Sequence, residues 1–231
     1  MKRGLGHVEF VVSFVLFVGF LVFAFYFFSP LEGNRIIDST LFYTMDEIYS
    51  NSSVIIETLS VVISEEVSES LIAIPVDNRQ NMGVYIEDSK GNPLAGKFNP
   101  LTEIVHIERG EERFFIIKFS EVLGKGNLND GILLTQEEFF ISSSDSLEVV
   151  SEKRVEDIFE RYEGDGYLEL REAFNLPARA NFGFRLVLSD NTIEALNPVP
   201  EGLEVYSETR RVEVLRLNGA SEFGDLEVRI W

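Results

Sequence analysis

The stretch FVVSFVLFVGFLVFAFYFF, residues 10–28, decides how this chain is organised. It holds eight of the twenty phenylalanines, and no charged residue occurs between Val11 and Pro30. Because an α-helix rises about 1.5 Å per residue, a run of this length matches the ~30 Å hydrocarbon core of a bilayer. A helix packed against a soluble core has a polar face, and this run has none. We therefore expect a single N-terminal transmembrane helix over residues 5–30.

The charges on either side of the apolar run predict its orientation. Lys2 and Arg3 precede it, and an acidic body follows it. The positive-inside rule then places the N-terminus in the cytoplasm and the C-terminal domain outside the cell. We expect a single-pass protein of the cell membrane, with residues 31–51 as a membrane-proximal helix or linker and residues 52–231 as an extracellular domain.

The residues ahead of the apolar run differ from an ordinary secretory signal. The chain begins MKRGLGHVEF, residues 1–10, with a basic pair, a glycine and, five residues after that glycine, Glu9. This order resembles the class III signal of type IV prepilins, as found in archaeal pilin-like proteins and in the related tight-adherence pseudopilins. Residues 1–4 would then be the leader. Archaeal members often have Gln where this chain has Leu5, so the sequence departs from the family pattern there.

The resemblance implies a role for three positions. A prepilin-type peptidase would cut between Gly4 and Leu5 and leave the apolar helix on the mature protein. Glu9 would become the fifth mature residue and pair with the newly exposed amine of a neighbouring subunit. A carboxylate needs such a partner, because drawing it to the bilayer centre costs up to ~3 kcal/mol. In the alternative, the leader stays uncleaved and Glu9 reaches into the headgroup layer of a plain signal anchor.

Composition restricts the chemistry of the exported body. The formal net charge of −19 repels nucleic acid and attracts cations, so we expect no nucleic-acid partner. The absence of cysteine excludes disulfides, thiolate zinc sites and cysteine nucleophiles. Of the two histidines, His7 lies at the membrane border, and His106 is expected to be at the surface or half-buried in a strand. We predict neither an enzyme nor a cofactor, although a glycosidase-type carboxylate pair would be recognised only in space.

The body is predicted to be a mainly-β, β-sandwich-like ectodomain with one or two short helices. Apolar residues at helical spacing predict a membrane-proximal helix that ends near Asn51, and two further helices at 152–162 and 168–174. Strands are expected where β-branched and aromatic residues gather, at 54–63, 71–76, 84–87, 104–108, 114–119, 131–134, 137–141, 182–188, 203–206, 211–217 and 226–231.

Turn chemistry and layer packing complete the predicted fold. Glycine among polar neighbours at 89–93 and 109–112 predicts two hairpin connections. The pattern favours one sandwich-like unit with the later helices against one side. Two smaller lobes, 52–146 and 147–231, are the alternative.

The C-terminal third carries a second resemblance. Three stretches follow one another, KRVEDIFERY at 153–162, YLELREAFNLP at 167–177 and FGF at 182–184, before a closing LEVRIW at 226–231. This order is similar to that of archaeal pilin-like ectodomains, in which a helix ending in Tyr precedes a short helix ending in Leu-Pro and a last strand ends in Trp. These aromatic and aliphatic residues are expected to form a core.

An acidic string after the predicted helix at 152–162 resembles part of a calcium-binding EF-hand loop. Arg161 stands at the first ligand position, where a carboxylate is expected, so an acidic turn between two helices is the simpler interpretation. The candidate calcium ligands are Glu163, Asp165, Glu169 and Glu172.

Two other motifs have a simple interpretation. Residues 91–98 match a phosphate-binding P-loop until Phe98, which replaces the magnesium-binding hydroxyl, and the Asn-Pro that follows prevents the required helix. A hairpin is expected there. Asn51 begins Asn-Ser-Ser, a candidate N-glycosylation sequon that would be reachable in an exported protein.

These observations lead to competing hypotheses. In the first, the chain is a pilin-like or pseudopilin subunit whose apolar helix packs with copies of itself or with other pilin-like subunits. An ectodomain as large as 31–231 favours a minor component of a type IV pilus-like assembly. In the second, it is an uncleaved, signal-anchored surface domain that acts as a binding module. A third, an anchored hydrolase, requires a carboxylate pair that the sequence does not locate.

Overall fold

The computed structural model describes residues 5–27, 31–77, 79, 81–177 and 180–231. Side chains are described over the same ranges, except at 5–8, 26–27 and 31–36. Within the described residues the chain is mainly β, with thirteen strands and four helices. The expectation of a mainly-β body with short helices is confirmed at this level.

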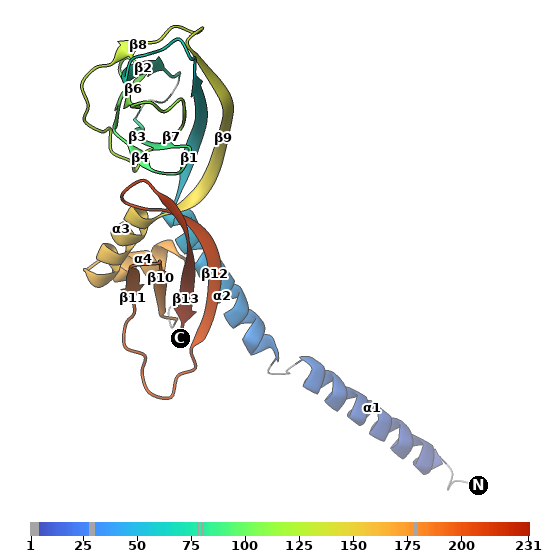
Figure 1. Cartoon of the computed structure of the whole chain (residues 1–231). Coiled ribbons are helices and arrows are strands. Elements are labelled where there is room, and N and C mark those ends of the chain that lie inside the picture. The colour runs from blue at the N-terminus through green and yellow to red at the C-terminus, as the bar shows by residue number, and fades with distance from the viewer. Residues whose placement is uncertain (1–4, 28–30, 78, 80, 178–179) are drawn as a thin grey trace.

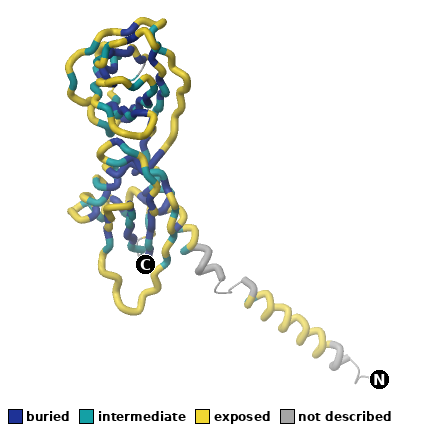
Figure 2. The backbone as a smooth tube through the Cα atoms, in the orientation of Figure 1, coloured by how far each residue is buried: buried dark blue, intermediate teal, exposed yellow. Residues whose placement is uncertain are grey.

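Two long helices open the structure and have opposite surroundings. α1 (Leu5–Phe27) stands apart from the body, and its described side chains are exposed except for Ala24, which is half-buried (Figures 1 and 2). α2 (Leu31–Ser52) lies against the body and buries Leu41, Met45 and Ile48. Their spacing of four and three residues places these three side chains on one face of the helix, as expected for an amphipathic helix.

The strands form two sheets. The larger has nine strands in the order β11-β10-β13-β12-β9-β1-β7-β3-β4, and the smaller has the order β5-β6-β2-β8. Neighbours are antiparallel, except that β12 runs parallel to the end of β9 and β8 runs parallel to β2. The strands are β1 (Ser53–Ile63), β2 (Leu71–Pro75), β3 (Gly83–Asp88), β4 (Pro93–Leu94), β5 (Gly96–Asn99), β6 (Ile104–Glu108), β7 (Phe114–Ser120), β8 (Ile132–Leu133), β9 (Phe139–Ser151), β10 (Phe182–Val187), β11 (Thr192–Ala195), β12 (Tyr206–Leu215) and β13 (Ser221–Ile230).

The long β1–β9 pair joins two separate cores. It extends from Ser53 opposite Val150 to Ile63 opposite Phe139 (Figure 1). At one end lies the distal lobe, whose core comes from the second half of β1 and from β2, β3, β5, β6 and β7. At the other end lies the proximal lobe, whose core comes from α2, the two later helices and β10 to β13. The alternative boundary between residues 146 and 147 falls inside β9, so one continuous strand crosses it.

A tyrosine at the C-terminal end of a helix connects several elements of the proximal lobe. α3 (Glu152–Glu163) and α4 (Tyr167–Ala173) bring aromatic rings onto β10. The buried hydroxyl of Tyr162 donates to the carbonyl oxygen of Phe182 at 2.7 Å and accepts from the amide of Asn197 at 3.2 Å. Its ring meets those of Tyr167 and Phe182 edge-on, with centroids 4.9 and 5.4 Å away. Tyr162 therefore joins the helix, the strand and the loop after β11.

A buried arginine closes the distal lobe. The guanidinium of Arg109 donates to the carbonyl oxygens of Val67, Glu69 and Glu112 at 2.7, 2.9 and 2.8 Å. The predicted hairpin at 109–112 is wrong, because β6 belongs to the smaller sheet and β7 to the larger one. The turn instead carries the chain from one sheet to the other, and Arg109 fastens it to the connection between β1 and β2.

Several strands differ from those predicted: β4, β5 and β11 were not predicted, and the predicted strands at 203–206 and 211–217 correspond to the single strand β12. β9 continues for ten residues beyond 141, through a serine-rich stretch with low β-propensity, because its backbone pairs with β1. Residues 203–205 lie outside any strand, and β12 begins at Tyr206. Pro198, Pro200 and Gly202 disfavour strand structure in the segment that precedes β12. The predicted hairpin at 89–93 is confirmed as the turn between β3 and β4.

Replacing Arg109 with Met should lower the free energy of unfolding by about 2–4 kcal/mol, because three carbonyl oxygens, that of the buried Val67 among them, lose their charged donor. Arg113 is the matched control, since it is exposed and pairs with the exposed Glu65. Arg113→Met should cost less than about 0.5 kcal/mol. Denaturant titration of the full chain measures both values, and equal losses would contradict the anchoring role of Arg109.

Candidate functional site

The described surface of α1 is apolar on every side. Phe10, Phe17 and Phe25 are 72%, 59% and 77% exposed. Neighbouring positions along the helix are exposed as well, so the apolar residues do not form a single stripe that could pack against the body. The other large exposed apolar residues of α1 are Val11, Val12, Phe14, Val15, Leu16, Val18, Phe20, Leu21, Val22 and Phe23.

Only part of the predicted processing and assembly set lies within the described structure. Lys2, Arg3 and Gly4 fall outside the described residues, and Leu5 begins α1 without a described side chain. The side chain of Glu9 is described and exposed. A search of the described residues identifies no helix with the length and hydropathy that crossing a membrane requires.

α2 is fixed to the proximal lobe by polar contacts around its apolar face. A guanidinium nitrogen of Arg210 on β12 lies 2.9 Å from the carboxylate of Asp46. The same guanidinium is 5.9 Å from the ring centroids of Phe42 and Tyr49. These contacts fix α2 against β12 of the proximal lobe.

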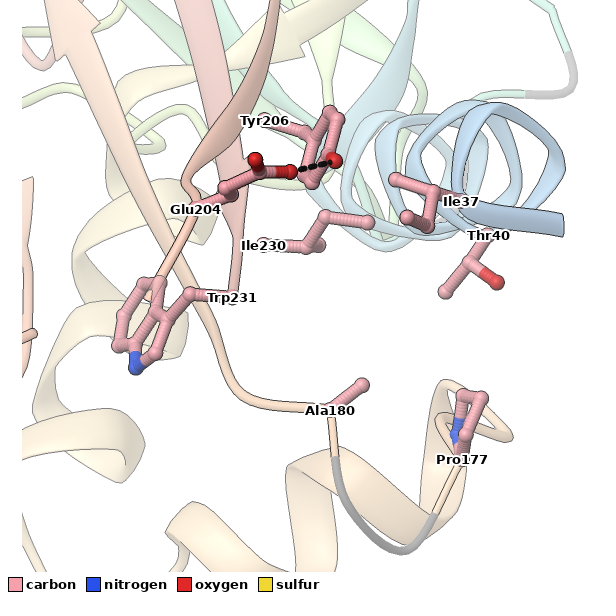
Figure 3. A pocket seen from close by; sticks show the side chains of 8 residues that line it. All are labelled: Ile37, Thr40, Pro177, Ala180, Glu204, Tyr206, Ile230 and Trp231. Atoms are coloured by element: carbon pink, nitrogen blue, oxygen red, sulfur yellow. Dashed lines mark hydrogen bonds between the residues drawn. The ribbon is translucent and has the colours of Figure 1, made fainter. Parts of the chain in front are cut away.

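A pocket of about 460 Å³ lies where α2 meets the end of the proximal lobe (Figure 3). The hydroxyl of Tyr206 donates to the carboxylate of Glu204 at the pocket wall. Trp231, the only tryptophan of the chain, contributes another part of the wall and exchanges backbone hydrogen bonds with Asn181 at 2.8 and 3.1 Å. The lining residues are Ile37, Thr40, Pro177, Ala180, Glu204, Tyr206, Ile230 and Trp231.

Sequence reasoning did not predict this pocket. Its walls come from α2, from the segment after α4 and from the two last strands, which lie far apart in the chain. The only signal was the aromatic character of Tyr206 and Trp231, and an aromatic residue in a β-rich domain is usually part of a core.

His106 occupies a polar site in the distal lobe and is buried, contrary to the expectation of a surface or half-buried residue. Its Nδ1 accepts the backbone N–H of Gly131 at 3.0 Å, and its Nε2 lies 3.5 Å from a carboxylate oxygen of Asp130. Lys97 also contacts Asp130, at 3.0 Å. Burial is the largest influence on the pKa of His106 and lowers it from 6.5. The negative charge of Asp130 raises this pKa, and the positive charge of Lys97 lowers it further. The neutral imidazole of His106 on β6 thus holds the segment at 126–134, called the strap below, against the smaller sheet.

The acidic string after α3 does not form a calcium loop. An EF-hand needs a loop of about 12 residues, whereas only residues 164–166 separate α3 from α4. Within the described residues, no three His, Asp or Glu side chains lie close enough together to hold a metal ion. The structure therefore gives no support to the calcium hypothesis. The residues concerned are Glu163, Asp165, Glu169 and Glu172.

The two remaining motifs occupy ordinary structural positions. Asn51 is exposed at the end of α2, and its side-chain amide donates to the carbonyl oxygen of Glu47 at 2.8 Å. Residues 91–98 run through the β3–β4 turn into β5, where Phe98 is buried in the distal core. A strand stands where a P-loop requires a helix.

Comparisons with protein-family models, with curated proteins and with solved structures find no match to this chain.

Acid should loosen the strap through His106. Because its folded pKa lies below 6.5, the unfolded state binds more protons, so this contribution to stability is complete above pH 6.5 and is lost as the pH falls below it. In His106→Asn the side-chain oxygen can still accept from Gly131 but does not titrate. Unfolding free energies between pH 7.5 and 5 should therefore fall less in the variant, with slopes differing by at most ~1.4 kcal/mol per pH unit. Identical slopes would contradict this role.

Proposed function

We propose that this protein is a membrane-anchored, extracytoplasmic subunit of pilin-like type and a minor structural component of a type IV pilus-like assembly. α1 is its transmembrane helix, with the N-terminus in the cytoplasm and both lobes outside. The packing of the smaller sheet beside the larger one supports a sandwich-like distal lobe. The membrane, a prepilin-type peptidase and other pilin-like subunits or copies of itself are its partners.

The contrast between α1 and α2 carries the proposal. α2 buries one apolar face, made by Leu41, Met45 and Ile48, against the proximal lobe, whereas α1 leaves apolar side chains exposed all round along its described length. Burying a Val, Leu or Phe side chain is worth about 1.5–3 kcal/mol. Over a dozen such residues the gain is so large that α1 will be covered by lipid or by other apolar helices.

No helix of the described residues meets the length and hydropathy needed to cross a membrane. The full apolar run of the sequence, residues 10–28, nevertheless supports lipid as that cover, because its length suits a bilayer and it contains no charged residue. Glu9 is the one charged residue at the entrance to this run. An intramembrane carboxylate is retained where it has a partner, and the amine of a neighbouring processed subunit supplies one. This pairing would set the register of packed α1 helices.

A structural role also agrees with the contacts of two ionisable residues of the body, His106 and Arg216. The imidazole of His106 is committed to Gly131 and Asp130. Arg216 contacts three carboxylates, those of Glu152, Asp190 and Glu222, and fastens α3 to two strand connections. Both clusters stabilise the fold.

One observation favours the alternative, an uncleaved anchored binding module. β12 pairs with β9 only at Val150 and Ser151, so the outer edge of β9 continues beyond β12. Residues 140–148 are exposed on both faces, including Phe140 and Leu147. An open strand edge with apolar side chains is suited to adding a strand from another protein. The state of the leader separates the two hypotheses.

Processing at Gly4 tests the proposal. The mature protein extracted from membranes should begin at Leu5, as shown by intact mass and N-terminal sequencing. Gly4→Val should leave residues 1–4 attached, because the peptidase needs a small residue before the cut. Gly6→Val makes the same change two residues later, beyond the cut, and should be processed normally. A wild-type protein that retains Met1 would favour the uncleaved anchor.

A further inference from the structure

The pocket at the end of the proximal lobe has the chemistry of a site for hydrocarbon. Ile37, Ile230, Pro177 and Ala180 supply aliphatic walls, and Tyr206 and Trp231 also line the pocket (Figure 3). The volume of about 460 Å³ lies in the usual range of small-molecule sites, about 300–1,000 Å³. A pocket of this size and lining favours an apolar ligand.

The polar groups of the pocket do not suit a charged headgroup. The Glu204 carboxylate already accepts the hydroxyl of Tyr206. Among the described residues that line the pocket, none is Lys, Arg or His. Glu204, the charged residue among the described lining residues, would repel an anionic group, whereas it would not repel an uncharged chain.

The pocket also lies at the end of the body from which the apolar helix emerges. Ile37 is six residues after the start of α2, a rise of about 9 Å. The headgroup layer on each side of a bilayer is about 5–8 Å thick. The pocket is therefore near the level of the lipid headgroups if α1 spans the membrane.

Other residues around Trp231 suit the same environment. A second hollow that also includes Trp231 is lined by Val199 and Val205 of the loop before β12, which are both exposed, and by the charged Glu227 and Arg229. Trp and Tyr are enriched at membrane interfaces, where an amphipathic ring meets both water and lipid. The end of the proximal lobe thus presents aromatic and aliphatic side chains towards the membrane.

We propose that this pocket binds one hydrocarbon chain of a membrane lipid, which seats the proximal lobe on the bilayer. The proposal rests on the proposed function, because it requires α1 to hold this end of the body at the membrane. It adds a second contact with lipid, made by the folded body. This contact limits how far the body can tilt relative to the bilayer.

The single tryptophan makes the proposal measurable. The full chain in detergent is titrated with phosphatidylcholine that carries bromine on an acyl chain, and Trp231 fluorescence is recorded, since bromine quenches a nearby indole. We expect saturable quenching in the wild-type protein. In Ala180→Phe the ring fills space that the chain would occupy, and excluding about two methylene groups should raise the half-quenching lipid concentration roughly tenfold. Ala95→Phe, an exposed change in the distal lobe, should match the wild type.

Each other outcome has a distinct meaning. Absence of quenching in the wild type, or equal quenching in Ala180→Phe, would overturn the proposal. So would fluorescence that changes with protein concentration and not with lipid, because a second copy would then fill the pocket. If Ala180→Phe does not fold, as judged by circular dichroism, Ala180→Leu replaces it. Flotation with vesicles separates the two proposals: a wild-type chain that floats without quenching contradicts the pocket alone, and one that does not float contradicts the anchor.

Discussion

The removal of apolar side chains from water is the constraint on which this structure depends, and the body and α1 differ in how they satisfy it. Both lobes bury their apolar side chains in cores of their own, and α2 adds one face to the proximal core. α1 has no such cover within the described structure, and its phenylalanines and valines are exposed. The hydrophobic effect therefore stabilises the folded body, whereas the apolar surface of α1 is exposed along its described length.

The architecture of the body follows from one long pair of strands. β1 and β9 pass from the proximal to the distal lobe without interruption, with a bulge beside Ser60 and Val61. A small cluster of Val54, Ile56, Val149 and Leu215 fills the junction. A continuous backbone ladder with an apolar junction is stiffer than a flexible linker, so the distal lobe is held away from the end that carries α1.

Sequence patterns predicted what depends on local residues and missed what depends on distant ones. The helices and most strands followed from hydrophobic spacing, and the turn at 89–93 from its glycine. The serine-rich part of β9 could not be predicted, because its partner strand lies some eighty residues earlier. Arg109 lies in a turn-like string, and only the tertiary fold brings three carbonyl oxygens to it. The pocket at Trp231 likewise exists only once α2 meets the last strands.

The most direct test of the account asks what surrounds α1. The chain contains no cysteine, so one introduced cysteine is the only thiol that a maleimide can modify. Val18→Cys lies in α1, and Leu101→Cys lies in the distal lobe, where Leu101 is 94% exposed. In sealed vesicles with the body outside, a membrane-impermeant maleimide should modify position 101 and spare position 18. Equal labelling of the two positions would show that α1 is in water and would contradict the account.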